Sequence, residues 1–226
     1  MDPLPSGTPA YLASPPGAQR GLVVIPDIWG LRPLFTEMCD DLSVRTGWSV
    51  GSFDPFGGDD LPGADEAEGF PRRSDALRNL DDASVLGDAM ALADSMGLAE
   101  VGLIGFCMGG MYALKSSATA RFDRVVGFYG IIRVPTDWEG GGQGQPLDAL
   151  ASRGDCEVMA VVGTVDPWTP PDQVDELEGL GVNVLRYEGA DHGFVHDPSR
   201  PAHRPDDAAD AWSRALEFLG HRAPTG

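Results

Sequence analysis

The chain alternates between short apolar runs and longer segments in which apolar residues recur with helical spacing. The apolar runs, which predict strands, are residues 22–25, 48–53, 101–105, 125–129, 157–163 and 182–187. Several runs are continuous rather than alternating, which is typical of strands covered on both faces. The intervening segments predict helices over 33–46, 75–96, 109–119, 171–180 and 206–219.

Residues at the ends of these segments support the helix boundaries. Pro33 suits the first turn of its helix, and Gly47 suits the end. In the same way Ser74 is a candidate N-cap for the helix 75–96, and Gly97 is a stop signal.

Alternation of strands and helices along the whole chain predicts an α/β fold, with a mostly parallel sheet and helices on both faces. The 226 residues are expected to form a single domain, 1–226, without room for a large cap. The glycine-rich segment 139–146 is interpreted as a flexible excursion, because the alternation continues after it.

Charge narrows the range of partners. The formal net charge is −19, and Lys115 is the only lysine. So negative a field argues against nucleic acid or an anionic membrane as a partner. An anionic substrate would need a local patch of arginines. We expect a small-molecule substrate, and a monomer or weak homodimer.

The three cysteines, Cys39, Cys107 and Cys156, are widely spaced and include no C-x-x-C pair. They predict neither a disulfide framework nor a zinc site, and Cys39 and Cys156 are interpreted as small buried hydrophobes. The N-terminus has no apolar core of a signal peptide, and no apolar run approaches the length of a membrane span. A reducing cytoplasm is the expected location.

Cys107 lies in the sequence GFCMGG, directly after a predicted strand and before a predicted helix. G-x-C-x-G is the thiol form of the nucleophile elbow, a sharp turn that needs small residues two positions either side of the nucleophile. Here those positions hold Gly105 and Gly109. The Met108 amide, and the Ile28 amide in the loop after the first strand run, are the candidate oxyanion donors.

A nucleophile needs a base, and the base needs an orienting acid. In elbow enzymes the chain order is nucleophile, acid, base. Cys107, Asp166 and His192 follow that order, and each comes after a predicted strand. His196 is the rival base. The alternative for each residue is structural: Cys107 as a buried hydrophobe, Asp166 as a turn residue and His192 as a packed histidine.

Six segments of this chain resemble the dienelactone hydrolase family of α/β hydrolases. They are VVIPDIWGL (23–31), FDPFG (53–57), GLIGFCMGG (102–110), FYG (128–130), VVGTVDPWTP (161–170) and ADHGF (190–194). The resemblance implies an α/β-hydrolase fold, a catalytic triad of Cys107, Asp166 and His192, and oxyanion amides at Ile28 and Met108. It also implies hydrolysis of a dienelactone or related enol ester, without a cofactor or metal, in aromatic degradation.

Two positions depart from the family pattern. Where the family has a glutamate that helps to generate the thiolate, this chain has Asp27, which we expect to act on Cys107 if it reaches far enough. Where the family has a substrate-binding arginine, this chain has His196. The remaining candidates for substrate binding are Trp29, Arg72, Arg73, Arg78, Tyr129 and Trp168.

These residues predict a hydrolase that cleaves a small lactone or activated ester through a thioester. The thiol nucleophile suits a substrate with a good leaving group. The alternative is a degenerate member that binds a small ligand or partner without catalysis, motivated by the changes at Asp27 and His196.

Overall fold

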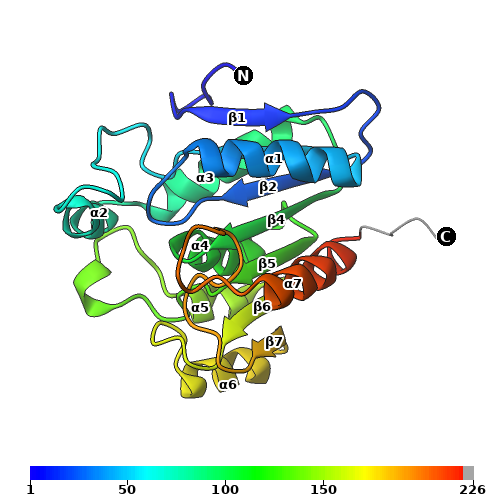
Figure 1. Cartoon of the computed structure of the whole chain (residues 1–226). Helices are drawn as coiled ribbons and strands as arrows, with labels where there is room; N and C mark the ends of the chain where they lie inside the picture. The colour runs from blue at the N-terminus through cyan, green and yellow to red at the C-terminus, as the bar shows by residue number, and fades with distance from the viewer. Residues whose placement is uncertain (221–226) are drawn as a thin grey trace.

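A computed structural model describes residues 1–220 and contains one seven-stranded sheet (Figure 1). The strands are β1 Ala10–Ala13, β2 Gly21–Ile25, β3 Ser49–Phe53, β4 Val101–Phe106, β5 Arg124–Phe128, β6 Glu157–Gly163 and β7 Asn183–Tyr187. Their order is β1-β3-β2-β4-β5-β6-β7. All neighbouring pairs are parallel except β1 with β3. The prediction of a mostly parallel sheet is therefore confirmed.

Helices cover both faces of the sheet. They are α1 Pro33–Thr46, α2 Gly69–Leu77, α3 Asp82–Ser95, α4 Met108–Ser116, α5 Pro146–Ser152, α6 Pro171–Gly179 and α7 Pro205–Phe218, with short 3-10 helices η1 Ser117–Thr119 and η2 Thr136–Trp138. In Figure 1, α1 and α7 lie in front of the sheet, and α2 stands apart at the left. In the described part of the chain, no helix is long and apolar enough to cross a bilayer.

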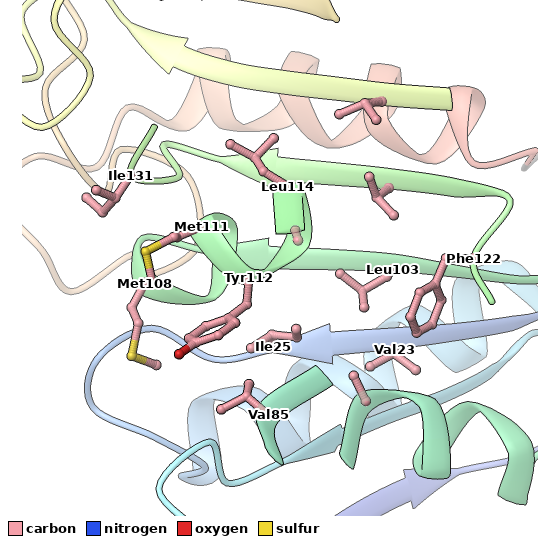
Figure 2. Close-up of a cluster of buried hydrophobic side chains, with 14 of the residues drawn as sticks. Val23, Ile25, Val85, Leu103, Met108, Met111, Tyr112, Leu114, Phe122 and Ile131 are labelled. Atoms are coloured by element: carbon pink, nitrogen blue, oxygen red, sulfur yellow. The ribbon is translucent and has the colours of Figure 1, made fainter. Parts of the chain in front are cut away.

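Two buried clusters fill the space between the sheet and its helices. Leu22 and Val24 belong to the cluster that contains residues of α1 and α7, whereas Val23 and Ile25 belong to the cluster that contains residues of α3, α4, α5 and α6. Successive strand residues point to opposite faces, so a continuous apolar run contributes side chains to both clusters. Figure 2 shows side chains of α4, including Met111 and Leu114, beside those of the sheet in the second cluster. Cys39 and Cys156 are buried as expected.

The structure corrects three predictions of local structure. Strand β1 was not predicted, because its four residues are only half-buried. The helix predicted over 75–96 is two helices, and the cap of the second is Asp81, whose side chain accepts from the Ala83 amide at 3.0 Å. Ser74 is therefore not an N-cap; it lies inside α2 and accepts a hydrogen bond from the Trp138 indole.

The glycine-rich segment 139–146 packs against neighbouring helices. The Gly142 carbonyl accepts from the Asp82 amide at 2.9 Å, and a side chain at Gly140 would collide with the Arg78 carbonyl. Gln143 donates to the Leu77 carbonyl at 2.6 Å. The expected excursion is thus held in place by α2 and α3.

Candidate active site

Cys107 occupies the turn between β4 and α4 with backbone angles of φ 55° and ψ −116°. A residue other than glycine pays strain at positive φ, which persists only where the surrounding structure imposes it. A Cβ at Gly105 would lie 2.0 Å from the Gly109 carbonyl oxygen, and a Cβ at Gly109 would lie 2.2 Å from the Ile25 carbonyl oxygen. Neither position has room for a side chain, as the elbow motif requires.

Backbone hydrogen bonds fix this turn. The Cys107 amide donates to the Phe128 carbonyl at 3.0 Å, and the Cys107 carbonyl accepts from the Met111 amide at 3.0 Å. The side chain is partly exposed, unlike those of the two other cysteines. It also stands at the N-terminus of α4, where the helix dipole favours negative charge on the sulfur. These features favour a reactive thiol over a buried hydrophobe.

Asp166 and His192 meet at the carboxyl edge of the sheet, after β6 and β7. His192 Nδ1 lies 2.9 Å from Asp166 Oδ2. The second oxygen, Oδ1, accepts from the Trp168 amide at 2.8 Å. Asp166 is buried, so both of its oxygens are satisfied and the imidazole is held with Nε2 free.

The pKa of His192 depends on the charge of Cys107. Burial alone would lower the pKa of His192, but a negative charge on Cys107 and the Asp166 carboxylate together raise this pKa to about 10. Nε2 is buried and makes no well-aligned hydrogen bond within residues 1–220. His192 Nε2 is therefore available to exchange a proton with the Cys107 thiol, and the Asp166 carboxylate would stabilise the imidazolium.

The loop after β2 passes beside the elbow. The Asp27 carbonyl accepts from the Gly30 amide at 3.0 Å. Because carbonyl and amide point in opposite directions across a trans peptide, the Ile28 N–H faces away from this turn. In the described residues, neither the Ile28 nor the Met108 amide donates a hydrogen bond. Both amides are free to act as the predicted oxyanion donors.

The Asp27 carboxylate accepts hydrogen bonds that fix this loop, and none of its partners in the described part of the chain is Cys107. Its Oδ1 accepts from the Trp29 amide at 2.9 Å and from Arg32 Nη1 at 2.7 Å. Its Oδ2 accepts from Arg32 Nη2 at 3.0 Å and from His196 Nε2 at 2.8 Å. Burial would raise the pKa of Asp27, but these partners hold the pKa well below its usual range. A carboxylate so fully engaged is a poor base, so the predicted activation of Cys107 by Asp27 does not fit.

His196 and Tyr129 are buried, so their predicted contact with substrate does not fit either. Tyr129 follows β5 with a positive φ of 39°, and its hydroxyl hydrogen-bonds to His196 Nδ1. Burial lowers the pKa of His196, which favours a neutral ring donating from Nε2 to Asp27. The Tyr129 ring also meets the His192 ring edge-on, with centroids 5.1 Å apart. Tyr129 and His196 thus support the loops that carry the active residues.

The three candidate arginines lie on α2 and at its C-terminal end. Arg73 is buried and donates only to backbone carbonyls, including that of Ile28 at 3.1 Å. Arg78 donates to the Asp137 carbonyl. Arg72 is exposed, and its side chain makes no hydrogen bond among the described residues. None of the three lines the hollow at His192.

Arg200 is a site residue that the sequence analysis missed. Its guanidinium lies over Gly193, where an added Cβ would fall 2.5 Å from Nη1. It lines a hollow of about 660 Å³ together with Trp168 and His192. Among residues 1–220, it is the one part-buried arginine whose guanidinium makes no hydrogen bond or ion pair. No motif marks Arg200, which lies eight residues after His192.

No group of three or more His, Cys, Asp or Glu side chains within residues 1–220 is arranged to hold a metal ion. A model of the dienelactone hydrolase family matches residues 8–223.

The chain belongs to the dienelactone hydrolase family.

Curated relatives in this family match over part of their length. "Probable 2-oxo-3-(5-oxofuran-2-ylidene)propanoate lactonase" of Bradyrhizobium sp is 32% identical over 126 residues, covering 53% of this chain and 50% of the relative. Carboxymethylenebutenolidase of Pseudomonas putida is 31% identical over 125 residues, covering 53% of this chain and 48% of the relative. The aligned part thus spans about half the length of these relatives.

Solved structures agree on the fold. The crystal structure named "Putative Dienelactone Hydrolase from Klebsiella pneumoniae" superposes with a TM-score of 0.82, at 21% identity, covering 95% of this chain and 93% of that one. Esterase 2 of Thermogutta terrifontis, phosphonylated by sarin, gives a TM-score of 0.63 at 15% identity, covering 96% and 91%. Together with the sheet topology, these likenesses show an α/β-hydrolase fold.

Proposed function

We propose that this protein is a carboxylic ester hydrolase that cleaves a small lactone or activated ester through Cys107, His192 and Asp166. The observation that carries the proposal is the strained elbow at Cys107 beside a histidine that hydrogen-bonds Asp166 at 2.9 Å. The names of the relatives, a lactonase and a carboxymethylenebutenolidase, support a lactone or enol ester as substrate.

The proposed reaction has two acyl-transfer steps. His192 takes the proton from the Cys107 thiol, and the thiolate attacks the carbonyl carbon. Amides of Ile28 and Met108 stabilise the resulting oxyanion, and such a donor typically contributes about 3–4 kcal/mol. The bond from carbon to the leaving oxygen breaks as His192 returns the proton to that oxygen, which leaves a thioester. Water, deprotonated by His192, then attacks the thioester, and the C–S bond breaks to release the acid and Cys107.

The second candidate is a member of the family that binds a ligand without catalysis. The changes at positions 27 and 196 favour it, since Asp27 is engaged by Arg32 and His196. The two candidates are separated by turnover of p-nitrophenyl acetate with and without iodoacetamide. We expect steady turnover that alkylation abolishes in proportion to the Cys107 modified. Absence of turnover, with Cys107 unreactive at neutral pH, would contradict the hydrolase.

Arg200 predicts a preference for substrates with a carboxylate. An unpaired guanidinium that lines the same hollow as His192 offers a local positive charge in a chain of net charge −19. We expect Arg200→Gln to lower kcat/KM for carboxylate-bearing lactones by about tenfold, the loss typical of a hydrogen-bonded charge pair, and to spare neutral lactones. The matched control is Arg45→Gln, on the exposed side of α1. Equal losses on anionic and neutral lactones would contradict this role.

A further inference from the structure

An aromatic pair stands at the loop of the candidate oxyanion amide. Trp29 directly follows Ile28, and its ring centroid lies 6.4 Å from that of Phe70 on α2. Arg73 of the same helix packs over the Trp29 ring and donates to the Ile28 carbonyl at 3.1 Å. The helix α2 is thereby tied to this loop.

A second aromatic pair stands beside His192. Trp138 and Trp168 stack with ring centroids 5.4 Å apart and an interplanar angle of 20°. The Trp168 ring is also tilted against the His192 ring, with centroids 6.4 Å apart. Buried Trp138 donates from its indole to the Ser74 hydroxyl at 2.8 Å, which connects this pair to α2 as well.

Contacts through α2 join the two pairs into one group of rings that extends from the Ile28 loop to His192. Phe70 and Ser74 are four residues apart on α2 and therefore share a face of the helix. Contacts run from the Ile28 loop through α2 to the tryptophan stack and on to His192. We call the four rings the aromatic rim. They are Trp29, Phe70, Trp138 and Trp168.

Two members of the rim are incompletely covered by the protein. Phe70 is 44% exposed and Trp168 is 37% exposed, and they are the most exposed large aromatic side chains within residues 1–220. Exposed apolar rings beside a reactive group provide surface that a ligand can cover. Aromatic rings associate in stacked or edge-on arrangements, as the Trp138–Trp168 stack already shows.

We propose that the aromatic rim binds a flat aromatic group of the substrate against Phe70 and Trp168. This assignment rests on the proposed ester hydrolysis. It narrows the substrate class to esters or lactones that carry an aromatic ring. The rim then selects substrates by packing against their aromatic ring. Cys107 and His192 carry out the ester hydrolysis, which is the same for all substrates.

Three esters test this assignment. Vinyl acetate has no ring, phenyl acetate has a ring on the leaving group, and vinyl 3-phenylpropanoate has a ring on the acyl group. For each ester, kcat/KM of Trp168→Leu and of Phe70→Leu is divided by the wild-type value, which cancels the intrinsic reactivity of the ester. Val44→Ala, 86% exposed on α1, is the control.

We expect both rim variants to lose about tenfold more kcat/KM on at least one ring-bearing ester than on vinyl acetate, mainly through KM. The Val44→Ala variant is expected to match wild type on all three. Losses that are equal across the three esters would overturn the role of the rim.

Failure of the wild type to hydrolyse any ester would overturn the proposed function instead. The rim is then tested by tryptophan fluorescence during titration with 3-phenylpropan-1-ol. Saturable quenching in wild type that is weakened at least about fivefold in Trp168→Leu supports the rim. Identical titrations of the two proteins would overturn it.

Discussion

Replacing Cys107 with alanine is expected to lower kcat for an activated ester by at least about 10³-fold, since the members of a catalytic triad act as a unit. Residual turnover would come from the free amides of Ile28 and Met108 and from substrate binding. The measurement is kcat and KM for p-nitrophenyl acetate, with far-ultraviolet circular dichroism to confirm the fold. Activity within tenfold of wild type would contradict a nucleophilic Cys107.

Cys156→Ala is the matched control for this variant. Cys156 is a buried thiol before β6 whose pKa burial raises to about 11, so it stays protonated and unreactive at neutral pH. Its removal is expected to leave kcat unchanged. Cys107→Ser is less informative, because a hydroxyl is also a competent nucleophile at an elbow.

Asp27→Asn is expected to lower the free energy of unfolding at pH 7 by about 3 kcal/mol, the loss typical of breaking a buried ion pair. Asp27 is 2% exposed and accepts two hydrogen bonds from Arg32 and one from His196. An amide nitrogen in its place cannot accept from these donors. Urea unfolding measures the difference, and Asp41→Asn, at an exposed aspartate of α1, is the control.

The contribution of Asp27 also depends on pH. Its pKa in the folded protein is held below the value of about 4 that it has when unfolded. The stabilisation is therefore complete above about pH 4 and is lost as pH falls toward the folded pKa. The gap between wild type and Asp27→Asn should narrow below pH 4. A variant as stable as wild type at pH 7 would show that Asp27 does not hold the loop.

The elbow and the strand pattern were predictable because each is encoded locally. Two glycines flank Cys107 at positions where a Cβ would meet backbone within about 2 Å. The elbow's need for small residues is therefore visible in the residues next to Cys107. Strands β2 to β6 were recognisable because burial on both faces demands continuous apolar runs.

Features made by contacts between distant segments were not predictable in this way. Strand β1 forms by antiparallel pairing with β3, some forty residues later in the chain. The roles of Asp27 and His196 follow from a contact across 169 positions of sequence. Arg200 lines the hollow at His192 only because its loop folds back over Gly193.

The most direct test of the nucleophile is the mass of the enzyme during turnover. Wild type is mixed with an excess of p-nitrophenyl acetate, quenched in acid within the first turnovers and digested for peptide mass spectrometry. The account predicts an acetyl group on Cys107, lost when the quenched peptide is treated with hydroxylamine, which cleaves thioesters. Turnover without any acyl adduct on Cys107, or an adduct on another residue that is kinetically competent, would contradict it.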